Sequence, residues 1–216
     1  MRKIIGLIKA SHFGPTLIVT SISFLFAANY WWEGPAYVIA FGVFCGQLVV
    51  GWSNDLIDYE DDVRHKRKNK PLVSGHITRG ELISWLRFMV PFSFIANLLG
   101  PLGLMGGLVY QLGVLCGVAY NLYFKFSPWS PLPYAIAFAA LPSSVAISKD
   151  VTPPVWMWLG GALFGMAAHF LNVLKDMQED RESEIRGLPQ LLGSTRSIIA
   201  AVLLAGLGVF TLVIFN

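Results

Sequence analysis

The chain has 216 residues, of which 55% are hydrophobic and only 13% are charged, and its formal net charge is +3. Soluble domains carry about 25% charged residues, so this composition excludes an ordinary soluble protein and indicates one embedded in a membrane. The basic residues lie beside apolar runs, which gives nucleic-acid binding no support.

Seven apolar windows are long enough to cross a bilayer, whose hydrocarbon core needs about 20 helical residues. Breaks with turn residues, such as Gly34-Pro35 and Pro153-Pro154, separate them. The runs are too long for barrel strands and do not alternate. We therefore predict an all-α, multi-pass transmembrane helical bundle with spans at 11–30, 36–53, 82–100, 102–122, 131–149, 155–174 and 197–215.

The distribution of lysine and arginine predicts the orientation of this bundle. If the chain crosses the membrane at each of the seven predicted spans, all of its 16 Lys and Arg residues except Lys149 lie on the same side of the membrane as the N-terminus. Cytoplasmic loops of membrane proteins carry this excess of basic residues. We therefore expect a multi-pass protein of the cell membrane with a cytoplasmic N-terminus.

The second span ends in an acidic segment, GWSNDLIDYEDD (51–62), on the predicted cytoplasmic side. Carboxylates beside hydrocarbon cost several kcal/mol unless something compensates them, and they also repel one another. A spacing of four residues places Asn54, Asp58 and Asp62 on one helix face. Asp55 points about 100° away from Asn54, and we expect it to orient a neighbour. A bound cation would explain this cluster.

A second acidic segment, NVLKDMQEDRE (172–182), ends the sixth span. Asn172, Asp176 and Asp180 repeat the four-residue spacing, and both segments continue with a proline and a glycine at matching positions (71 and 75, 189 and 193). We interpret this as a weak internal repeat, the kind of symmetry that membrane folds use to build a central site. Two facing helical stripes would then place six oxygen-bearing side chains around one cavity.

Oxygen ligands of this kind suit Mg²⁺, which prefers few carboxylates, retained waters and substrate phosphate. The sequence has no His/Cys cluster typical of zinc, and Cys45 and Cys116 lie inside apolar runs as buried small residues. A solvated acidic flank is the simpler interpretation of either segment alone. Two segments with matched spacing, each beside a hydrophobic span, favour a magnesium site.

These residues resemble the UbiA-type intramembrane prenyltransferase superfamily. NDLIDYEDD (54–62) is similar to the family motif NDxxDxxxD, and DMQED (176–180) is similar to its second motif, DxxxD. The resemblance extends from about residue 39 to 193 and includes the segments NKPLVSG (69–75), AYNLYFKFSP (119–128) and GLPQLLG (187–193).

The resemblance implies transfer of a prenyl group from a prenyl diphosphate to a lipophilic acceptor, in a cavity open to the cytoplasmic side and among membrane lipids. It implies Mg²⁺ as cofactor, held by Asn54, Asp58, Asp176 and Asp180, with Asp62 completing the first stripe or binding through water. Lys70, Lys125 and Tyr120 become candidates for diphosphate contact, although Lys125 could equally extend to the membrane interface. Asp55, Asn172 and His169 become candidates for a supporting layer around the ligands, with a satisfied core histidine as the alternative for His169.

Two features depart from the family pattern. Lys70 stands where the family usually has arginine, which keeps the charge but loses the bidentate fork. Family members typically have nine spans, whereas this chain supports seven. We therefore expect residues 1–216 to form a single domain that is truncated at its C-terminus or lacks two wall helices.

Three other functions are compatible with parts of this pattern. A non-catalytic divalent-cation carrier also needs intramembrane carboxylates, but it would not need basic loops beside both acidic segments. A CDP-alcohol phosphotransferase would need a D-G-x-x-A-R stretch, which the sequence lacks. An inactive scaffold is the third. The acceptor stays open among aromatic acids or quinone precursors, porphyrin-type rings, glycerol phosphate lipids and sugar phosphates.

Overall fold

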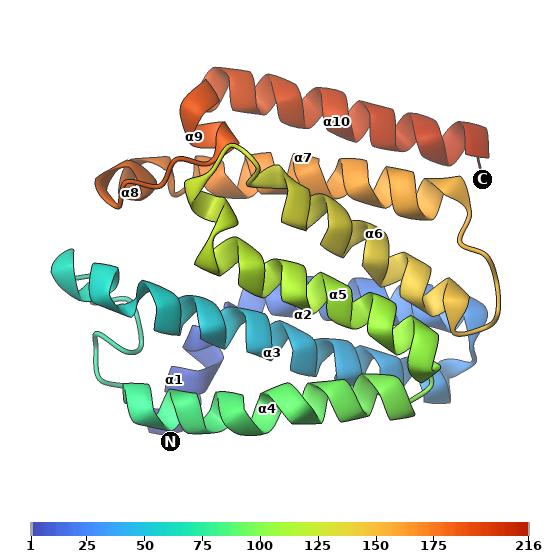
Figure 1. The fold of residues 1–216 in the computed structure, drawn as a ribbon, viewed down its shortest axis with the longest axis horizontal. Coiled ribbons are helices and arrows are strands. Elements are labelled where there is room, and N and C mark those ends of the chain that lie inside the picture. The colour runs from blue at the N-terminus through green and yellow to red at the C-terminus, as the bar shows by residue number, and fades with distance from the viewer. Residues whose placement is uncertain (1, 216) are drawn as a thin grey trace.

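Residues 2–215 are described here from a computed structural model of the chain. Each predicted span coincides with a helix (Figure 1). The elements are α1 (Arg2–Ala10), α2 (Phe13–Tyr30), α3 (Glu33–Arg64), α4 (Arg79–Leu99), α5 (Gly103–Leu122), the 3₁₀ turn η1 (Phe124–Phe126), α6 (Pro131–Ile147), the π-helical turn η2 (Trp156–Gly160), α7 (Gly161–Leu174), α8 (Met177–Glu182), α9 (Leu188–Leu192) and α10 (Ser194–Phe215).

The all-helical, multi-pass architecture predicted from the sequence is confirmed. Within the described residues, six helices are long and apolar enough to cross a membrane, and the helix Pro131–Ile147 is shorter, with 17 residues. The number of spans and the central cavity remain predictions. An apolar groove of about 440 Å³ lies between α3 and α4, where Leu56, Leu86 and Val90 help to line it.

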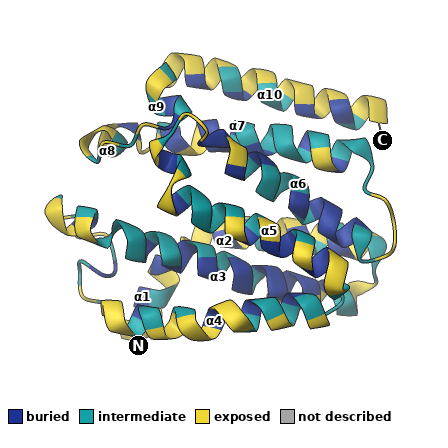
Figure 2. Cartoon of the chain, viewed as in Figure 1, coloured by how far each residue is buried: buried dark blue, intermediate teal, exposed yellow. Residues whose placement is uncertain are grey.

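The long helices lie side by side, with α3 at the centre of one half of the bundle (Figure 1). It packs against α2, α4 and α5, while α6 joins α5 to α7, and α10 packs against α7. Ile39, Val43 and Trp52 of α3 lie in the main hydrophobic core. Figure 2 shows that burial is concentrated on α3, whereas α10 and α4 are largely exposed. Exposed aliphatic side chains on α10 suit a lipid environment.

The turn between α1 and α2 packs closely against α3. His12 adopts the left-handed conformation, with φ 51° and ψ 57°, and turns the chain from α1 into α2. A Cβ atom at Gly51 would lie 2.6 Å from the backbone oxygen of Ser11, so only glycine allows this approach without a shift of the backbone. The indole Nε1–H of Trp52 donates to the backbone oxygen of Leu7 at 3.0 Å. The N-terminal turn is therefore held beside the first acidic segment.

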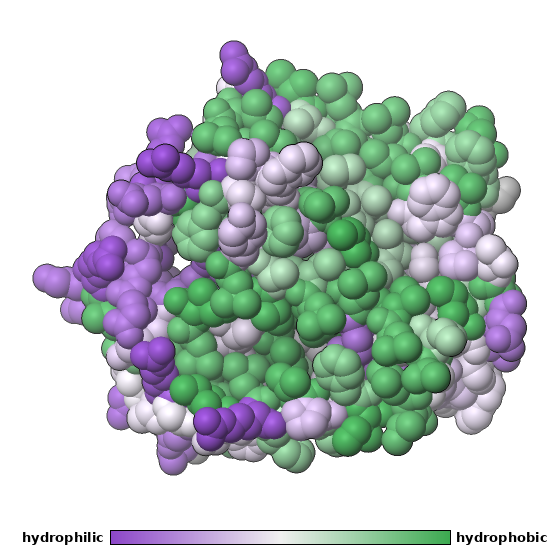
Figure 3. Space-filling view, viewed as in Figure 1, coloured by the Kyte–Doolittle hydropathy of each residue, from purple (hydrophilic) through white to green (hydrophobic). Residues whose placement is uncertain are grey.

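The two ends of the bundle differ in chemistry. Hydrophilic surface gathers at the end where α3 finishes and α8 lies (Figure 3). At the opposite end, the Lys149 ammonium lies 4.1 Å from the centre of the Trp31 ring, and the Trp31 indole donates to the Ser148 hydroxyl at 3.0 Å. Tryptophan is typical of membrane–water interfaces. The bundle thus places both acidic segments at one end and this aromatic contact at the other.

The second acidic segment differs from its predicted form. The prediction of one continuous helical stripe through Asn172, Asp176 and Asp180 is wrong, because α7 ends at Leu174 and Asp176 precedes a separate short helix, α8. Asp176 has φ −108° and ψ 3°, outside the helical region, and aspartate is common at positions just before a helix. Asp176 and Asp180 still lie one turn apart, since the Asp180 N–H donates to the Asp176 carbonyl at 2.8 Å.

Candidate functional site

The first acidic segment remains helical to its end. Because α3 runs without a break to Arg64, Asn54, Asp58 and Asp62 do lie on one helix at four-residue intervals. The Asn54 amide donates to the Asp58 carboxylate at 3.1 Å. Asp62 is buried and Asp58 is partly buried. Carboxylates in such positions need compensating cations or donors.

Lys70 and His12 meet the buried carboxylate of Asp55. The Lys70 ammonium donates to Asp55 Oδ1 at 3.2 Å and lies 3.8 Å from Asp62 Oδ2. Burial lowers the pKa of Lys70, but the charges of Asp55 and Asp62 outweigh it and leave the pKa raised. His12 Nε2 lies 3.3 Å from the same oxygen of Asp55. Asp55 therefore contacts both Lys70 and His12, and its role as an orienting residue stays a prediction.

Lys125 comes to the same end of the bundle from η1. Its side chain is buried and its ammonium forms an ion pair with the Asp58 carboxylate. The same nitrogen lies 5.2 Å from the centre of the Phe126 ring. In this arrangement the Lys125 ammonium is directed at the first acidic segment. A buried charge is tolerated because it is paired.

Asp180 is the better enclosed of the two carboxylates in the second motif. Its Oδ2 accepts a hydrogen bond from the Gln190 amide at 2.7 Å. Burial raises the pKa of Asp180, and the Gln190 hydrogen bond opposes that change. Asp176 is exposed, and Asn172 is exposed on the last turn of α7. Gln190 thus ties Asp180 to α9.

Tyr120 and His169 belong to an aromatic group beneath the acidic segments. The Tyr120 ring lies edge-on to Tyr134 and His169, with centroid distances of 5.1 Å and 5.4 Å. His169 is fully buried, and its Nε2 lies 3.0 Å from the hydroxyl of Ser130. The same hydroxyl accepts from the backbone N–H of Leu188 at 3.0 Å. His169 therefore helps to join α6, α7 and the start of α9.

Four residues of this region were not identified as site residues from the sequence: His12, Arg67, Ser183 and Gln190. Arg67 contacts both acidic segments, through Asp62 of α3 and Ser183 after α8. In the sequence it is one of several basic residues in a loop, and nothing distinguishes it from its neighbours. The signal for His12 is equally weak, because a single histidine at a helix break has no motif around it.

The donor set at this end of the bundle fits Mg²⁺ in its chemistry. Within residues 2–215, no three His, Cys, Asp or Glu side chains are grouped closely enough to hold a metal ion as they stand. Lysine, arginine and histidine side chains contact several of the carboxylates. Asp55 Oδ2 is buried and has no hydrogen-bond partner among the described residues. Oxygen donors from both segments, including this free lone pair, are the type that Mg²⁺ prefers. A cation could therefore be accepted if the basic side chains move to an anionic ligand.

The fold and this site together define a multi-pass helical membrane protein with an acidic and basic cluster at one end. The sequence model of the UbiA prenyltransferase family matches residues 16–216, and the chain belongs to this family. A lycopene elongase/hydratase from Corynebacterium glutamicum is 29% identical over 163 residues, which cover 70% of this chain and 55% of that protein. The chain thus spans about half the length of that curated relative.

Solved structures share the fold. A UbiA homolog from Archaeoglobus fulgidus bound to DMAPP and Mg²⁺ matches with a TM-score of 0.74 and 13% identity, over 95% of this chain and 75% of that chain. A structure of a digeranylgeranylglyceryl phosphate synthase matches with a TM-score of 0.70 and 18% identity, over 97% of this chain and 76% of that chain. These likenesses confirm the UbiA-type helical fold predicted from the motifs.

Proposed function

We propose that this protein transfers a prenyl group from an allylic prenyl diphosphate to a lipophilic acceptor, with Mg²⁺ as cofactor. The observation that carries the proposal is the meeting of acidic and basic side chains at one end of the bundle. Lys70 and Lys125 reach the carboxylates of α3, and Arg67 links α3 to α8. A diphosphate bound with its metal ion needs both signs of charge in one place.

Asn54, Asp58, Asp176 and Asp180 would hold the metal ion, with Asp62 as a further ligand directly or through water. Mg²⁺ bound there would neutralise charge on the departing diphosphate and so make it a better leaving group. The UbiA homolog bound to DMAPP and Mg²⁺ supports this choice of cofactor and substrate class.

Lys125, Lys70 and Tyr120 would contact the diphosphate. When the anion arrives, Lys125 can exchange its contact with Asp58 for one with a phosphate oxygen, which frees that carboxylate for the cation. Lys70 can do the same with Asp55. Ammonium–phosphate hydrogen bonds are charge-assisted and are therefore stronger than neutral ones.

Breaking the allylic C–O bond leaves positive charge on the prenyl chain. The rings of Tyr120 and Tyr134 lie beside the site, and aromatic faces attract cations. Apolar helices around them would exclude water that could otherwise capture the cation. The chain's own residues would thus bind the diphosphate and shield the cation.

The alternative function is a non-catalytic divalent-cation-binding or carrier protein. Such a protein would gain nothing from Lys70 and Lys125, which compete with a metal ion for Asp55 and Asp58. The acceptor is proposed only as a lipophilic molecule. The curated relative is a lycopene elongase/hydratase, so lycopene is the first acceptor to test, beside aromatic acids, porphyrin-type rings, glycerol phosphate lipids and sugar phosphates.

The test compares an ordinary prenyl diphosphate with one fluorinated near C1, using the full chain in lipid nanodiscs with an acceptor panel. Fluorine destabilises the allylic cation but barely alters size or charge, so we expect similar binding, much slower turnover, and no turnover without Mg²⁺. Equal turnover of the two diphosphates would overturn the ionisation mechanism. Failure to consume either would favour the carrier. Prenyl alcohol as the main product would support ionisation and count against transfer.

A further inference from the structure

Arg67 uses all three nitrogens of its guanidinium group to connect the two acidic segments. On the α3 side, Nη1 donates to Asp62 Oδ1 at 2.9 Å and to Asp61 Oδ2 at 3.2 Å. On the α8 side, Nη2 donates to the Ser183 hydroxyl at 2.7 Å and to the Glu179 backbone oxygen at 3.4 Å, and Nε lies 3.6 Å from the Glu179 carboxylate. The side chain is only 16% exposed.

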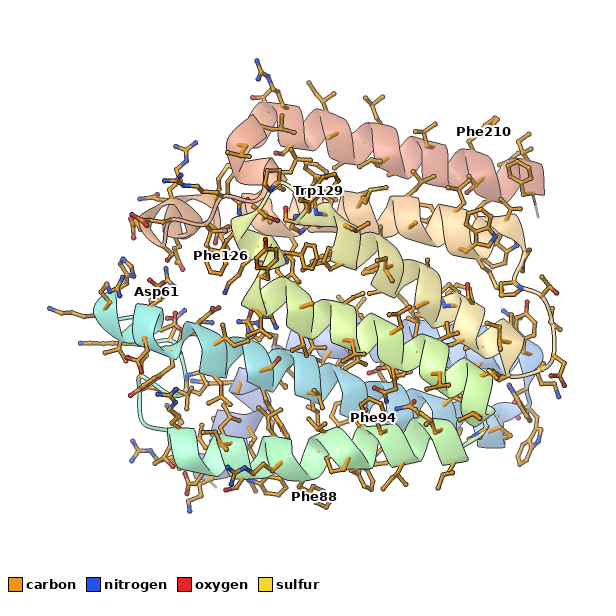
Figure 4. All side chains as sticks on the ribbon, viewed as in Figure 1. Asp61, Phe88, Phe94, Phe126, Trp129 and Phe210 are labelled. Carbon is orange, nitrogen blue, oxygen red and sulfur yellow. The ribbon has the colours of Figure 1, made fainter. Side chains whose placement is uncertain are left out.

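The same two segments are joined directly beside Arg67. The hydroxyl of Ser183 donates to Asp61 Oδ2 at 2.6 Å, so Asp61, Arg67 and Ser183 form a closed circuit of hydrogen bonds that we call the Arg67 clasp. Figure 4 shows Asp61 at the end of α3, on the side of the bundle that faces α8. The partners are more than 110 residues apart in sequence, with separations of 116 and 122, so the clasp is a tertiary contact and not part of a local turn.

The break between α7 and α8 explains why such a contact is needed. A continuous helix would fix the direction of Asp180 from the body of the bundle. Here the helix stops at Leu174, and α8 has only six residues, too few to be stable without tertiary contacts. Glu179 and Ser183, which Arg67 holds, lie on either side of Asp180 along the chain. Gln190 provides a second tether from α9.

We propose that Arg67 is a positioning residue that holds α8 against the end of α3, so that Asp180 is kept beside the first acidic segment. This inference rests on the proposed function only for its binding readout. The role needs the planar fork of arginine, because one group must serve acceptors on two sides at once, and the single ammonium of lysine cannot do so.

Two simpler roles for Arg67 predict different behaviour. As an ordinary basic residue of a cytoplasmic loop, or as a direct electrostatic contact to the diphosphate, it would be replaced well by lysine. Replacing Ser183 tests the clasp without changing the charge of the loop, because Ser183 belongs to the clasp and is uncharged. Lys68 is the matched control, since it is an exposed basic residue of the same loop.

The experiment measures amide hydrogen exchange across α8 and Mg²⁺-dependent binding of a labelled prenyl diphosphate, for the full chain and for Arg67→Lys, Arg67→Ala, Ser183→Ala and Lys68→Ala. Hydrogen bonds to charged groups are strong enough that losing the clasp should speed exchange in α8 by about tenfold or more. We expect this in both Arg67 variants, a smaller increase in Ser183→Ala and none in Lys68→Ala. Unchanged exchange in α3–α5 would show that the bundle stays folded.

Diphosphate affinity should fall in the same order. The proposal is overturned if Arg67→Lys keeps wild-type exchange and affinity, or if Arg67→Ala loses affinity while exchange in α8 is unchanged. If the wild-type chain binds no prenyl diphosphate with Mg²⁺, the proposed function fails, and the exchange result alone still decides the clasp.

Discussion

Asp58 occupies a position where loss of one charge has two consequences. It accepts from the Asn54 amide and pairs with the buried Lys125 ammonium. Without its carboxylate, the site loses one proposed metal ligand and Lys125 loses its counter-charge. Asp176 is exposed and carries the same proposed role on the second segment without such a partner inside the bundle.

Replacing Asp58 or Asp176 by asparagine should therefore weaken the Mg²⁺-dependent affinity for a prenyl diphosphate by about tenfold or more. Each substitution removes one charged metal ligand. Equilibrium binding of the labelled diphosphate, with and without Mg²⁺, measures the loss. Asp58→Asn should also lower thermal stability, since a buried lysine is left unpaired, whereas Asp176→Asn should not. The control is Glu60→Gln, whose side chain is 73% exposed. Equal damage from Glu60→Gln would contradict the assignment of the ligands.

The sequence alone identified the residues that form a motif. Asn54, Asp58 and Asp62 could be placed on one face because four-residue spacing fixes direction on any helix that continues, and α3 does continue. His12 and Arg67 could not be identified in this way. Their contacts join parts of the chain that are 43 and 116 residues apart in sequence. A local sequence pattern does not indicate which of several basic residues makes such a tertiary contact.

At the scale of elements, helix existence was predictable and helix continuity was not. An apolar run of about 20 residues can satisfy its backbone inside a bilayer only as a helix or barrel strand, so all the long helices were expected. The helix α7 ends at Leu174, at the end of the apolar run. Beyond this point the bilayer no longer requires the backbone to be helical. There the contacts of α8 with Arg67 and Gln190 hold the segment, and Asp176 stands before α8 without a side-chain capping hydrogen bond.

The close approach of α3 to the α1–α2 turn leads to a prediction about stability. Gly51→Ala would place a Cβ 2.6 Å from the Ser11 carbonyl oxygen, and relieving that clash should cost about 1–3 kcal/mol. Gly80→Ala is the matched control, because a Cβ there meets nothing within 4 Å and alanine favours a helix by about 0.5–1 kcal/mol over glycine. Thermal unfolding in detergent should show a lower midpoint for Gly51→Ala only. Equal midpoints for the two variants would mean that the turn does not press on α3.

The internal repeat seen in the sequence has a counterpart in the backbone. Gly75 and Gly193 occupy matching positions after the two acidic segments, and both have positive φ, 69° and 79°. Glycine tolerates this conformation at little cost, which explains the shared residue type. The repeat does not extend to the helices that carry the acidic motifs. The helix α3 continues through the first motif to Arg64, whereas α7 ends at Leu174, before the second motif.

At the scale of the whole molecule, charge separates the ends of the bundle. We propose that the end with both acidic segments faces the cytoplasm, because the predicted spans assign every lysine and arginine except Lys149 to that side of the membrane, and hydrophilic surface gathers there (Figure 3). Single cysteines at Asn69 and Thr152, introduced with Cys45 and Cys116 replaced by alanine, should report opposite sides. An impermeant maleimide applied to intact cells should label Thr152→Cys and reach Asn69→Cys only after permeabilisation. Labelling of Asn69→Cys in intact cells would show that this end of the bundle faces outward and would contradict the proposed orientation.

Because of the break before α8, the two acidic segments are held in place in different ways. Asn54, Asp58 and Asp62 are part of a helix of 32 residues packed against α2, α4 and α5, whereas Asp180 is held by Arg67 contacts on either side of it and by Gln190. If only a fraction of molecules holds α8 in the binding position, the apparent dissociation constant rises by the inverse of that fraction. Under the proposed function, a chain that binds by ordering α8 would give up some affinity, and release of the cleaved diphosphate would require only that this six-residue helix move away.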